Sequence, residues 1–325
     1  MAERIVIAGA SGFIGRYLAA RYRAQGAAVS LIGRRGTDAS WGDTSAITTV
    51  LDGAVLLINM AGKSVNCRYN TTNRAEIMRS RIDTTRELSA AIADCVSPPP
   101  LWINSSTATI YRHADDRAMT ERTGEIGTGF SVGIATAWEN ELFADDLPAT
   151  RRVALRMAIV LGNGSALVPL IRLTRCGLGG AQLDGRWFRA PSRVAAGTFH
   201  EFRARGGRQK FSWIHIADVM GIIEFIRAEP QLDGVINASA PNPVDNISMM
   251  TTLRRVLGVK FGIPTPRFLL EVGSALIRSE TELVLKSRWV VPQRVLDAGY
   301  RFEYPDLERA LVQIVNERRT SSSEA

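Results

Sequence analysis

Three glycines near the start of the chain constrain its fold more than any other feature. RIVIA at residues 4–8 is a short β-branched run, and Gly9, Gly12 and Gly15 follow it at a spacing of three. A helical pattern of apolar residues then covers residues 13–25. A glycine turn between a strand and a helix is the setting in which the amides of a helix N-terminus bind a pyrophosphate. The spacing therefore predicts a dinucleotide-binding unit, with an ordinary glycine-rich turn as the alternative.

The chemistry of a pyrophosphate site explains the choice of glycine. A tight turn needs backbone angles that other residues rarely adopt, and a Cβ would keep the phosphates away from the backbone amides. The candidate cofactor contacts in this turn are Gly9, Ser11, Gly12, Phe13, Ile14 and Gly15.

The end of the second expected strand indicates which dinucleotide binds. AVSLIG at 28–33 runs into Arg34 and Arg35. Proteins that bind NAD place Asp or Glu here to hold the ribose 2′-hydroxyl, whereas guanidinium groups suit the 2′-phosphate of NADP. We therefore predict NADP as the cofactor, with NAD as the second choice, and Arg34 and Arg35 as its contacts. Two solvated arginines in an arginine-rich chain are the alternative.

Strands and helices alternate along the first half of the chain. Apolar strands are expected at 4–8, 28–33, 54–60, 101–106 and 153–162, and helices at 13–25, 73–95 and 134–144. Strands that are apolar throughout, rather than alternating, are typical of a parallel sheet covered on both faces. The fold class predicted is α/β, a doubly wound parallel-sheet Rossmann fold.

The second half of the chain is less regular. Residues 177–210 are rich in Gly and Arg and are expected to form an extended loop, 211–226 a strand and a helix, 235–240 a strand, and the chain from Asn246 onward mostly helices. We predict an NAD(P)-binding Rossmann domain from residues 1–165 plus 211–240. A smaller, mostly helical substrate lobe is expected from residues 166–210 plus 241–325.

The net charge of +8 is unevenly distributed. Residues 183–210 hold seven basic and two acidic side chains, which supply +5 of it. Such a local surplus indicates an anionic partner or a solvated loop. A nucleic-acid partner is not expected, because no reading motif accompanies the charge.

Cysteine usage and hydropathy exclude other classes of protein. Cys67, Cys95 and Cys176 are widely spaced and odd in number, so neither a disulfide scaffold nor a metal-ligand set is expected. The N-terminus does not have the pattern of a signal peptide, and the charge-free stretches 95–111 and 157–171 are interrupted by Pro, Asn, Gly or Ser. We expect a cytoplasmic protein with no membrane partner.

Seven motifs along nearly the whole chain resemble one family. In order they are GASGFIG (9–15), INMAG (58–62), SSTATIY (105–111), ALRMAIVLG (154–162), FSWIHIADV (211–219), NASAPNPV (237–244) and LKSRWVVPQRVLDAGYRF (285–302). The chain resembles the atypical extended short-chain dehydrogenase/reductases, an epimerase family related to nucleotide-sugar epimerases, with a C-terminal domain of unknown function. The N-terminal motifs are shared by the superfamily, whereas FSWIH and the C-terminal run are more specific.

The resemblance implies roles for residues at the ends of two strands. Asn59, Ala61 and Gly62 match the loop beside the adenine ribose, and Ser105 joins them as a candidate cofactor contact. Thr107 matches the catalytic Ser or Thr that hydrogen-bonds the reacting hydroxyl or carbonyl; a threonine that merely ends a strand is the alternative.

One departure from the family concerns proton transfer. The active family carries a Tyr-x-x-x-Lys pair on a helix, in which tyrosinate is the base and the lysine lowers its pKa. Counting back from Glu139, the tyrosine position is Ser131 and the lysine position is Ala135. The chain has no Lys between 64 and 209 and no Tyr between 112 and 299, so a shift of register cannot restore the pair.

Several other groups are candidates for contact with the cofactor or substrate. Lys63 is the first choice among the cations after the INMAG motif, which also include Arg68, Arg79 and Arg81. Tyr111 and His113 lie close to Thr107, whereas His215 in an apolar strand is expected to be a core residue.

The sequence leaves two functions open. The first is an NADP-dependent epimerase or oxidoreductase acting on an anionic small molecule, either free or linked to a nucleotide. The second is a protein that binds NADP(H) without turnover, as a sensor or scaffold. The basic segment 183–203 either clamps an anionic substrate or forms a surface excursion or an oligomer contact.

Overall fold

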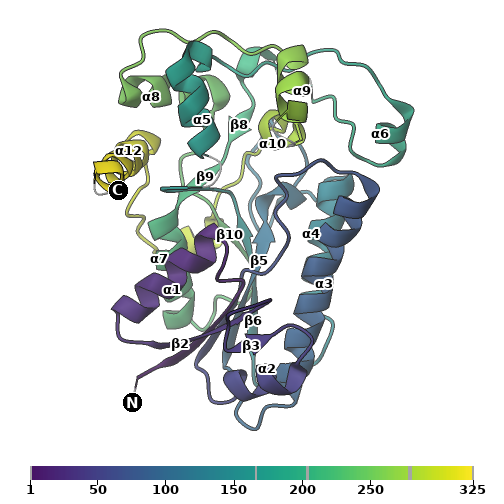
Figure 1. The fold of residues 1–325 in the computed structure, drawn as a ribbon, viewed down its shortest axis with the longest axis vertical. Helices are drawn as coiled ribbons and strands as arrows, with labels where there is room; N and C mark the ends of the chain where they lie inside the picture. Colours follow the sequence, from purple (N-terminus) through teal and green to yellow (C-terminus); the bar gives the residue numbers. More distant parts are fainter. Residues whose placement is uncertain (1, 165–166, 203–204, 277–279, 324–325) are drawn as a thin grey trace.

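A seven-stranded parallel sheet forms the centre of the computed structural model, which describes residues 2–164, 167–202, 205–276 and 280–323 (Figure 1). The strand order is β10-β6-β5-β4-β1-β2-β3. The strands are β1 (Arg4–Ala8), β2 (Ala28–Gly33), β3 (Ala39–Ser40), β4 (Leu56–Asn59), β5 (Leu101–Thr107), β6 (Arg151–Met157) and β10 (Gly234–Ala238). Every neighbouring pair is parallel, which confirms the predicted Rossmann-type fold.

Helices cover both faces of this sheet (Figure 1). They are α1 (Phe13–Ala24) and α7 (Ile216–Ala228) on one face, and α2 (Thr44–Leu51), α3 (Thr71–Ala93) and α4 (Phe130–Leu142) on the other. In β1, Ile5 and Ile7 pack in the core under α1 and α7, and Val6 and Ala8 pack in the core under α2 and α3. Two buried faces explain why the strands are apolar without alternation.

The prediction of one continuous strand at 153–162 is wrong in one respect, because the structure has two strands there. β6 ends at Met157, and β7 (Ile159–Leu161) leaves the sheet to pair with β9 (Trp213–His215). The break falls at Ala158, whose amide donates to the carbonyl of Ala238 at 2.9 Å. The chain thereby leaves the Rossmann sheet for the second part of the molecule.

A second group of elements lies beyond the carboxyl ends of the strands (Figure 1). It contains β8 (Lys210–Phe211) paired with β11 (Val244–Asp245), together with α5 (Leu167–Leu173), α6 (Pro191–Ala195), α8 (Asn246–Leu257), α9 (Arg267–Leu276), α10 (Glu282–Leu285) and α12 (Leu307–Ser323). The short helix α11 (Gln293–Asp297) instead packs beside the edge strand β10 and adds Val295 to the core under α1 and α7. Short irregular turns are η1 (Ala108–Ile110), η2 (Thr174–Leu178) and η3 (Arg205–Gly207). A separate apolar core joins α5, α8 and α12. The predicted boundaries of a substrate lobe stay a prediction.

The glycine- and arginine-rich stretch 177–210 is mostly irregular, as expected, but it includes the short helix α6. Arg203 of its basic set lies outside the described residues. None of the described helices combines the length and the apolar character that crossing a membrane requires.

Candidate functional site

Two of the three turn glycines are required by the fold itself. Gly9 has a φ of +80°, and a Cβ there would lie 2.6 Å from the amide nitrogen of Ala61. A Cβ on Gly15 would lie 2.6 Å from the carbonyl oxygen of Gly9. Both contacts are with backbone that cannot move aside, so these glycines let the turn approach the end of β4 and start α1.

Gly12 differs from them because the chain itself leaves room beside it. Its φ of −76° suits any residue, and among the described atoms a Cβ there would meet only the carbonyl oxygen of Gly9, at 3.5 Å. Gly12 is the N-cap of α1 without a side-chain cap, and the first turn holds no acidic residue. Open space beside uncapped amides at a helix N-terminus fits a phosphate group.

The remaining residues predicted to contact the cofactor in this turn, Ser11, Phe13 and Ile14, differ in their exposure. Ser11 is exposed, whereas Phe13 and Ile14 pack against the core under α1. A Cβ on Gly162 would lie 2.7 Å from the Phe13 ring, so Phe13 closes the turn against the end of β7.

Arg34 and Arg35 are exposed in the bend after β2. Among the described residues neither guanidinium has a hydrogen bond or an ion pair. The next acidic residue along the chain is Asp38, whose carboxylate accepts a hydrogen bond from the Leu31 amide at 2.7 Å. The end of β2 therefore offers two uncommitted cations, which fit a 2′-phosphate better than a ribose hydroxyl.

Asn59 stabilises the loop after β4 through side-chain hydrogen bonds. Its side chain is fully buried, donates to Asn104 Oδ1 at 2.7 Å and accepts from the Ala61 amide at 3.0 Å. Asn104 in turn donates to the Ser105 carbonyl at 3.0 Å. The two asparagines join the ends of β4 and β5, and the predicted contacts Ala61 and Ser105 are shaped by this pair.

A cavity of about 180 Å³ opens at these strand ends. It brings together the predicted residues Ala61, Gly62, Ser105 and Thr107 with Ser131 of α4. Its wall also contains Tyr69, Arg81 and Trp138. The hydroxyl oxygen of Thr107 accepts a hydrogen bond from the Thr109 amide at 3.1 Å, which leaves the hydroxyl proton to be donated elsewhere.

Ser131, at the position of the family's tyrosine, is linked to the C-terminal part of the chain. Its hydroxyl donates to Glu282 Oε2 at 2.7 Å, and His200 Nε2 lies 3.3 Å from the same oxygen. Burial alone would raise the pKa of Glu282, but the hydrogen bond and charge of His200, the charge of Lys286 and the Ser131 hydroxyl lower it to about 2. Ala135 is fully buried.

Tyr69 enters the cavity from the loop before α3. The residue is 9% exposed, and its ring meets Phe130 edge-on at 5.1 Å. Phe130 directly precedes Ser131, and both Tyr69 and Ser131 line the cavity. Burial, and next the charge of Glu282, raise the pKa of Tyr69, so the phenol keeps its proton.

Arg81 brings a positive charge to the same cavity. Its Nη1 donates to the carbonyls of Lys63 at 3.2 Å and Ile77 at 3.0 Å, and its guanidinium lies 4.9 Å from the centre of the Trp138 ring. Among the described residues it has no carboxylate partner. Burial lowers the pKa of Arg81 to about 10, which leaves it charged at neutral pH.

The remaining candidates from the sequence lie outside this cavity. Lys63 is paired with Glu76, Arg68 lies 3.7 Å from Glu280, and Arg79 is exposed. His215 is buried and caps α7, as its apolar strand predicted.

Tyr111 and His113 are engaged in the protein interior. The Tyr111 hydroxyl donates to Asn237 Oδ1 at 2.9 Å and accepts from Arg156 at 2.9 Å. His113 Nδ1 accepts from the Ser287 amide at 3.0 Å, and its ring stacks on Phe202. Neither residue lines the cavity.

A buried ion pair holds α4 against the sheet. Glu139 accepts from Arg156 Nε at 2.8 Å and Nη2 at 2.6 Å, and from the Ser106 hydroxyl at 2.5 Å. Both charged side chains are less than a tenth exposed. Because Ser106 precedes Thr107, this pair joins the helix that carries Ser131 to the strand that carries Thr107.

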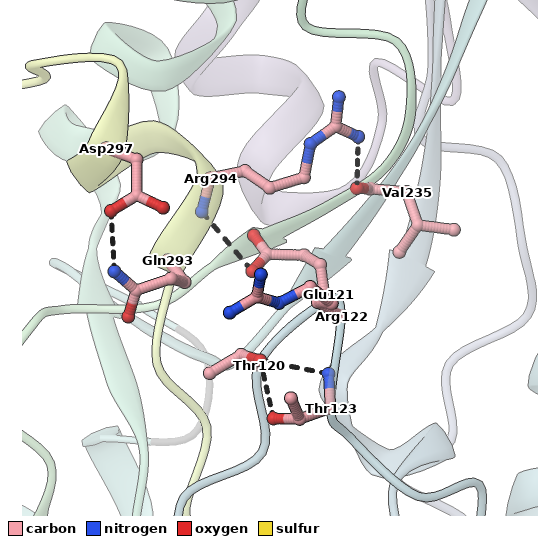
Figure 2. A pocket seen from close by; sticks show the side chains of 8 residues that line it. All are labelled: Thr120, Glu121, Arg122, Thr123, Val235, Gln293, Arg294 and Asp297. Carbon is pink, nitrogen blue, oxygen red and sulfur yellow. Dashed lines mark hydrogen bonds between the residues drawn. The ribbon is translucent and has the colours of Figure 1, made fainter.

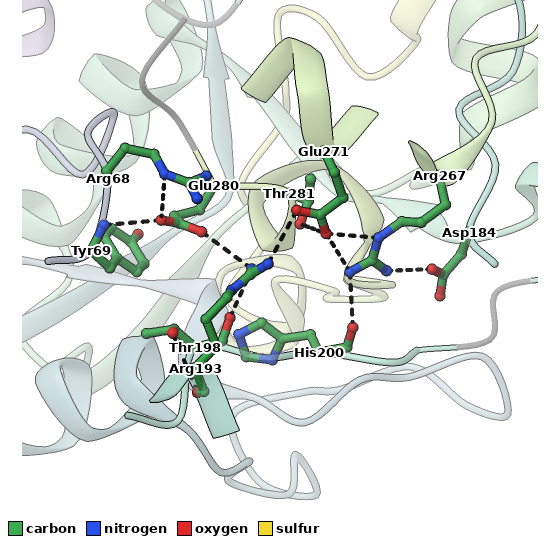
Figure 3. Close-up of polar contacts among 10 residues, drawn as sticks. All are labelled: Arg68, Tyr69, Asp184, Arg193, Thr198, His200, Arg267, Glu271, Glu280 and Thr281. Atoms are coloured by element: carbon green, nitrogen blue, oxygen red, sulfur yellow. Dashed lines mark hydrogen bonds and ion pairs between the residues drawn. The ribbon is translucent and has the colours of Figure 1, made fainter. Parts of the chain in front are cut away.

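The basic segment 183–202 crosses from the C-terminal helices to the ends of α3 and α4. Gly197 accepts from the Phe130 amide at 3.1 Å, and Ala196 accepts from Arg74 at 3.2 Å. Arg193 of this segment is neutralised by carboxylates of the C-terminal part of the chain. Figure 3 shows Arg193 between Glu271 and Glu280, at 3.1 and 3.5 Å.

The beginning of the same segment is held by a second buried ion pair. Arg267 contacts Asp184 at 2.6 Å and Glu271 at 2.7 Å (Figure 3). Arg186 and Arg189 are exposed, and Arg189 lies over the Phe199 ring. The two interpretations of this segment, a clamp for an anionic substrate or a surface excursion, therefore differ in the role they give to Arg186 and Arg189.

A larger depression of about 710 Å³ lies beside the edge strand β10 (Figure 2). Glu121 there accepts hydrogen bonds from the amides of Asn237 at 2.9 Å and Arg294 at 3.4 Å. The Arg294 side chain donates to the Val235 carbonyl at 2.9 Å. These side chains block the free edge of the sheet, and no residue predicted from the sequence lines the depression.

The sequence is similar to two protein-family models and to several known proteins. Residues 5–133 match the model of the NAD dependent epimerase/dehydratase family, and residues 265–314 match a domain of unknown function, DUF1731. The epimerase family protein SDR39U1 of Bos taurus is 30% identical over 96% of this chain and 99% of its own length. The epimerase family protein YfhF of Bacillus subtilis is 29% identical over 97% of this chain and 99% of its own.

Solved structures agree with these matches. A crystal structure of human SDR39U1 (isoform 2) with NADPH superposes with a TM-score of 0.81, at 27% identity over 96% of this chain and 99% of that one. A UDP-N-acetylglucosamine 4-epimerase from Methanobrevibacter ruminantium reaches a TM-score of 0.72 at 15% identity, over 99% of this chain and 100% of that one, which shows the shared fold alone.

Proposed function

Because the chain belongs to the epimerase family that includes the SDR39U1 proteins, we propose that it is an NADP-dependent epimerase or oxidoreductase. In this proposal NADPH binds along the glycine turn and the ends of β2, β4 and β5. A small anionic molecule, free or linked to a nucleotide, is the substrate and enters the cavity of about 180 Å³.

The observation that carries the proposal is the open space beside Gly12. A fold that needed glycine only for packing would crowd this position as it crowds Gly9 and Gly15, yet Gly12 faces uncapped helix amides. Support comes from the human relative crystallised with NADPH and from Arg34 and Arg35, whose guanidinium groups have no hydrogen bond or ion pair among the described residues.

The proposed contacts follow the strand ends. The glycine turn with Ser11, Phe13 and Ile14 surrounds the pyrophosphate. Ala61 and Gly62, positioned by Asn59, and Ser105 lie beside the rest of the dinucleotide, with Lys63 at the rim. The bound group would supply reversible hydride transfer. Thr107 would donate a hydrogen bond from its hydroxyl to the oxygen of the reacting carbon.

The anionic character of the substrate is inferred from charge. Arg81 keeps its charge in a partly buried site without a carboxylate partner among the described residues. A buried charge without a counter-charge is costly, so an anionic group of a ligand would stabilise it. Arg186 and Arg189 add exposed positive charge on the segment that crosses the ends of α3 and α4.

We expect NADPH to bind more tightly than NADH, and replacing both Arg34 and Arg35 with alanine to erase the difference. Each charge-assisted contact to a 2′-phosphate contributes about 1.5–3 kcal/mol, roughly 10- to 100-fold in affinity. Nucleotide fluorescence titrations measure both constants. The matched control is Arg79→Ala, an exposed cation on α3. A parent protein that binds the two nucleotides equally would contradict the assignment.

Thr107→Val is expected to lower kcat/KM roughly 30-fold, because a hydrogen bond to the reacting oxygen contributes about 2 kcal/mol in the transition state. The substitution keeps the side-chain volume but also removes the acceptor for the Thr109 amide, which costs about 1 kcal/mol of stability. Rates are therefore measured well below the melting temperature of the variant. Turnover at the parental rate would show that the site lies elsewhere.

A non-catalytic sensor or scaffold that binds NADP(H) is the second candidate. Ser131 and Ala135 favour it, because they stand where the family's tyrosine and lysine would act. The two functions are separated by saturating the protein with NADPH, adding sugar nucleotides, and following nicotinamide absorbance. Oxidation of the nucleotide supports the enzyme, and tight binding without oxidation supports the sensor.

A further inference from the structure

We propose that Tyr69 is the proton donor of this site and that Arg81 takes the positioning role of the lysine that α4 lacks. The inference rests on the proposed function, since it names groups that complete the same cavity. Both side chains come from the segment between β4 and the middle of α3, and neither comes from α4.

The first argument is the position of the Tyr69 hydroxyl. Ser131 occupies the sequence position of the family's tyrosine, and the Tyr69 ring packs against Phe130, the residue directly before Ser131. Both residues line the cavity together with Thr107. Tyr69 is anchored by the edge-on contact of its ring with Phe130 and by its amide, which donates to Glu280 at 2.9 Å. The Tyr69 phenol is thus held close to Ser131, the position on α4 at which the family has its tyrosine.

The second argument is the position of Arg81. Its guanidinium lies over Trp138, which is three residues after Ala135 on α4. A Cβ on Gly62 would lie 3.2 Å from Arg81 Cζ, so the cation sits directly against the predicted cofactor loop. Within the described part of the chain, its hydrogen bonds reach only the carbonyls of Lys63 and Ile77, which leaves Nη2 and Nε to donate to a ligand. A cation at this place holds ribose hydroxyls and stabilises a phenolate, as a lysine would.

The third argument concerns the protonation state. Burial and the charges of Glu282 and Glu280 keep the phenol protonated, so the resting side chain is an acid. Ser131 on the same wall donates to Glu282 Oε2 at 2.7 Å, and His200 Nε2 lies 3.3 Å from that oxygen. The charge of Glu282 near the phenol therefore favours its protonated form.

The proposed step balances for a carbonyl ligand. A reduced nicotinamide dinucleotide held by the glycine turn would supply a hydride to the carbonyl carbon, and the carbonyl oxygen would then require one proton. The O–H bond of Tyr69 breaks and an O–H bond forms on the ligand. The phenolate is stabilised by Arg81 and regains its proton from water. In the reverse direction the phenolate accepts the proton.

Tyr111, His113 and Lys286 do not line the cavity. The Tyr111 hydroxyl is bonded to Asn237 and Arg156, and His113 Nδ1 accepts from the Ser287 amide. Lys286 donates to the Thr109 carbonyl at 2.7 Å. Tyr69 is the tyrosine that lines the cavity among the described residues.

Fluorine NMR tests the inference without a substrate. The chain has six tyrosines, so replacing them with a ring-fluorinated tyrosine gives six signals. Tyr69→Phe assigns the signal of interest, and Ser131→Ala identifies it by perturbation if that variant fails to fold. Tyr304, which packs on His215, provides the control signal through Tyr304→Phe.

We expect the Tyr69 signal to move on saturation with NADPH and to take a different position with NADP⁺, while the Tyr304 signal stays fixed. On raising the pH, fluorotyrosine at position 69 should ionise at lower pH with NADP⁺ than with NADPH, because the positive ring favours a phenolate. Arg81→Gln should raise that ionisation pH, and Arg81→Lys should restore it.

The outcomes separate the two claims. Saturable binding with an identical Tyr69 signal in both nucleotides overturns the role of Tyr69 and leaves the proposed function standing. An unchanged ionisation in Arg81→Gln overturns the role of Arg81. Absence of nucleotide binding overturns the proposed function, and the inference that rests on it is overturned as well.

Discussion

A Gly12→Val variant should lose NADPH binding while it stays folded. The valine side chain has room within the protein, because among the described atoms only the Gly9 carbonyl oxygen lies within contact distance of a Cβ there, at 3.5 Å. The side chain would instead fill the space that the pyrophosphate needs in order to reach the amides of α1. We expect affinity to fall by at least about 100-fold, or about 2.7 kcal/mol, in a fluorescence titration.

The control for this variant is Gly133→Ala. Gly133 is exposed on α4, and a Cβ there meets no described atom within 4 Å, so NADPH affinity should not change. Circular dichroism checks that both variants are folded. A folded Gly12→Val protein with parental affinity would exclude the glycine turn as the nucleotide site.

Glu139→Ala should destabilise the protein by about 3–5 kcal/mol, because it leaves the Arg156 charge buried without its partner. The carboxylate accepts two hydrogen bonds from Arg156 and one from the Ser106 hydroxyl. Denaturant unfolding at neutral pH measures the loss. Since the pair also holds α4 against β5, the variant should place Ser131 and Thr107 less precisely.

Glu141→Ala is the matched control on the same helix. Glu141 pairs with Arg86, whose side chain is 61% exposed, and such a surface pair contributes at most about 1 kcal/mol. Equal losses in the two variants would show that the buried pair has no special role. Replacing both Glu139 and Arg156 with apolar residues should cost less than Glu139→Ala alone, because no uncompensated charge then remains.

The parts of the site that follow from local order could be predicted from the sequence. Apolar strands separated by helices imply a parallel sheet, and the carboxyl ends of its strands meet at one edge. Gly9, Ala61 and Thr107 follow or end β1, β4 and β5, which are neighbours in the sheet. Their gathering at one edge therefore needs only the strand pattern and the fold class.

The rest depends on contacts between distant segments. Ser131 and Glu282 are 151 residues apart, and Arg193 and Glu280 are 87 apart. A sequence pattern does not reveal ion pairs between residues that are far apart along the chain. The excess of basic residues at 183–210 therefore predicts more unpaired positive charges than the structure contains. Tyr69 was missed for the same reason, since its ring reaches the cavity only through packing on Phe130.

The division of one expected strand into β6 and β7 has a comparable cause. The apolar run 153–162 continues without a polar residue to mark the break, apart from Arg156, whose charge is neutralised by Glu139. The hydrogen bond from Ala158 to Ala238 and the pairing of β7 with β9 are tertiary interactions. Local sequence propensity does not predict them.

Calorimetric titration of the unmodified protein with NADPH tests the central claim most directly. The account predicts saturable binding of one NADPH per chain, with NADH weaker by at least about tenfold, since the 2′-phosphate contacts contribute more than about 1.4 kcal/mol. A titration without saturable heat at millimolar nucleotide, confirmed by an unchanged fluorine NMR spectrum, would contradict it.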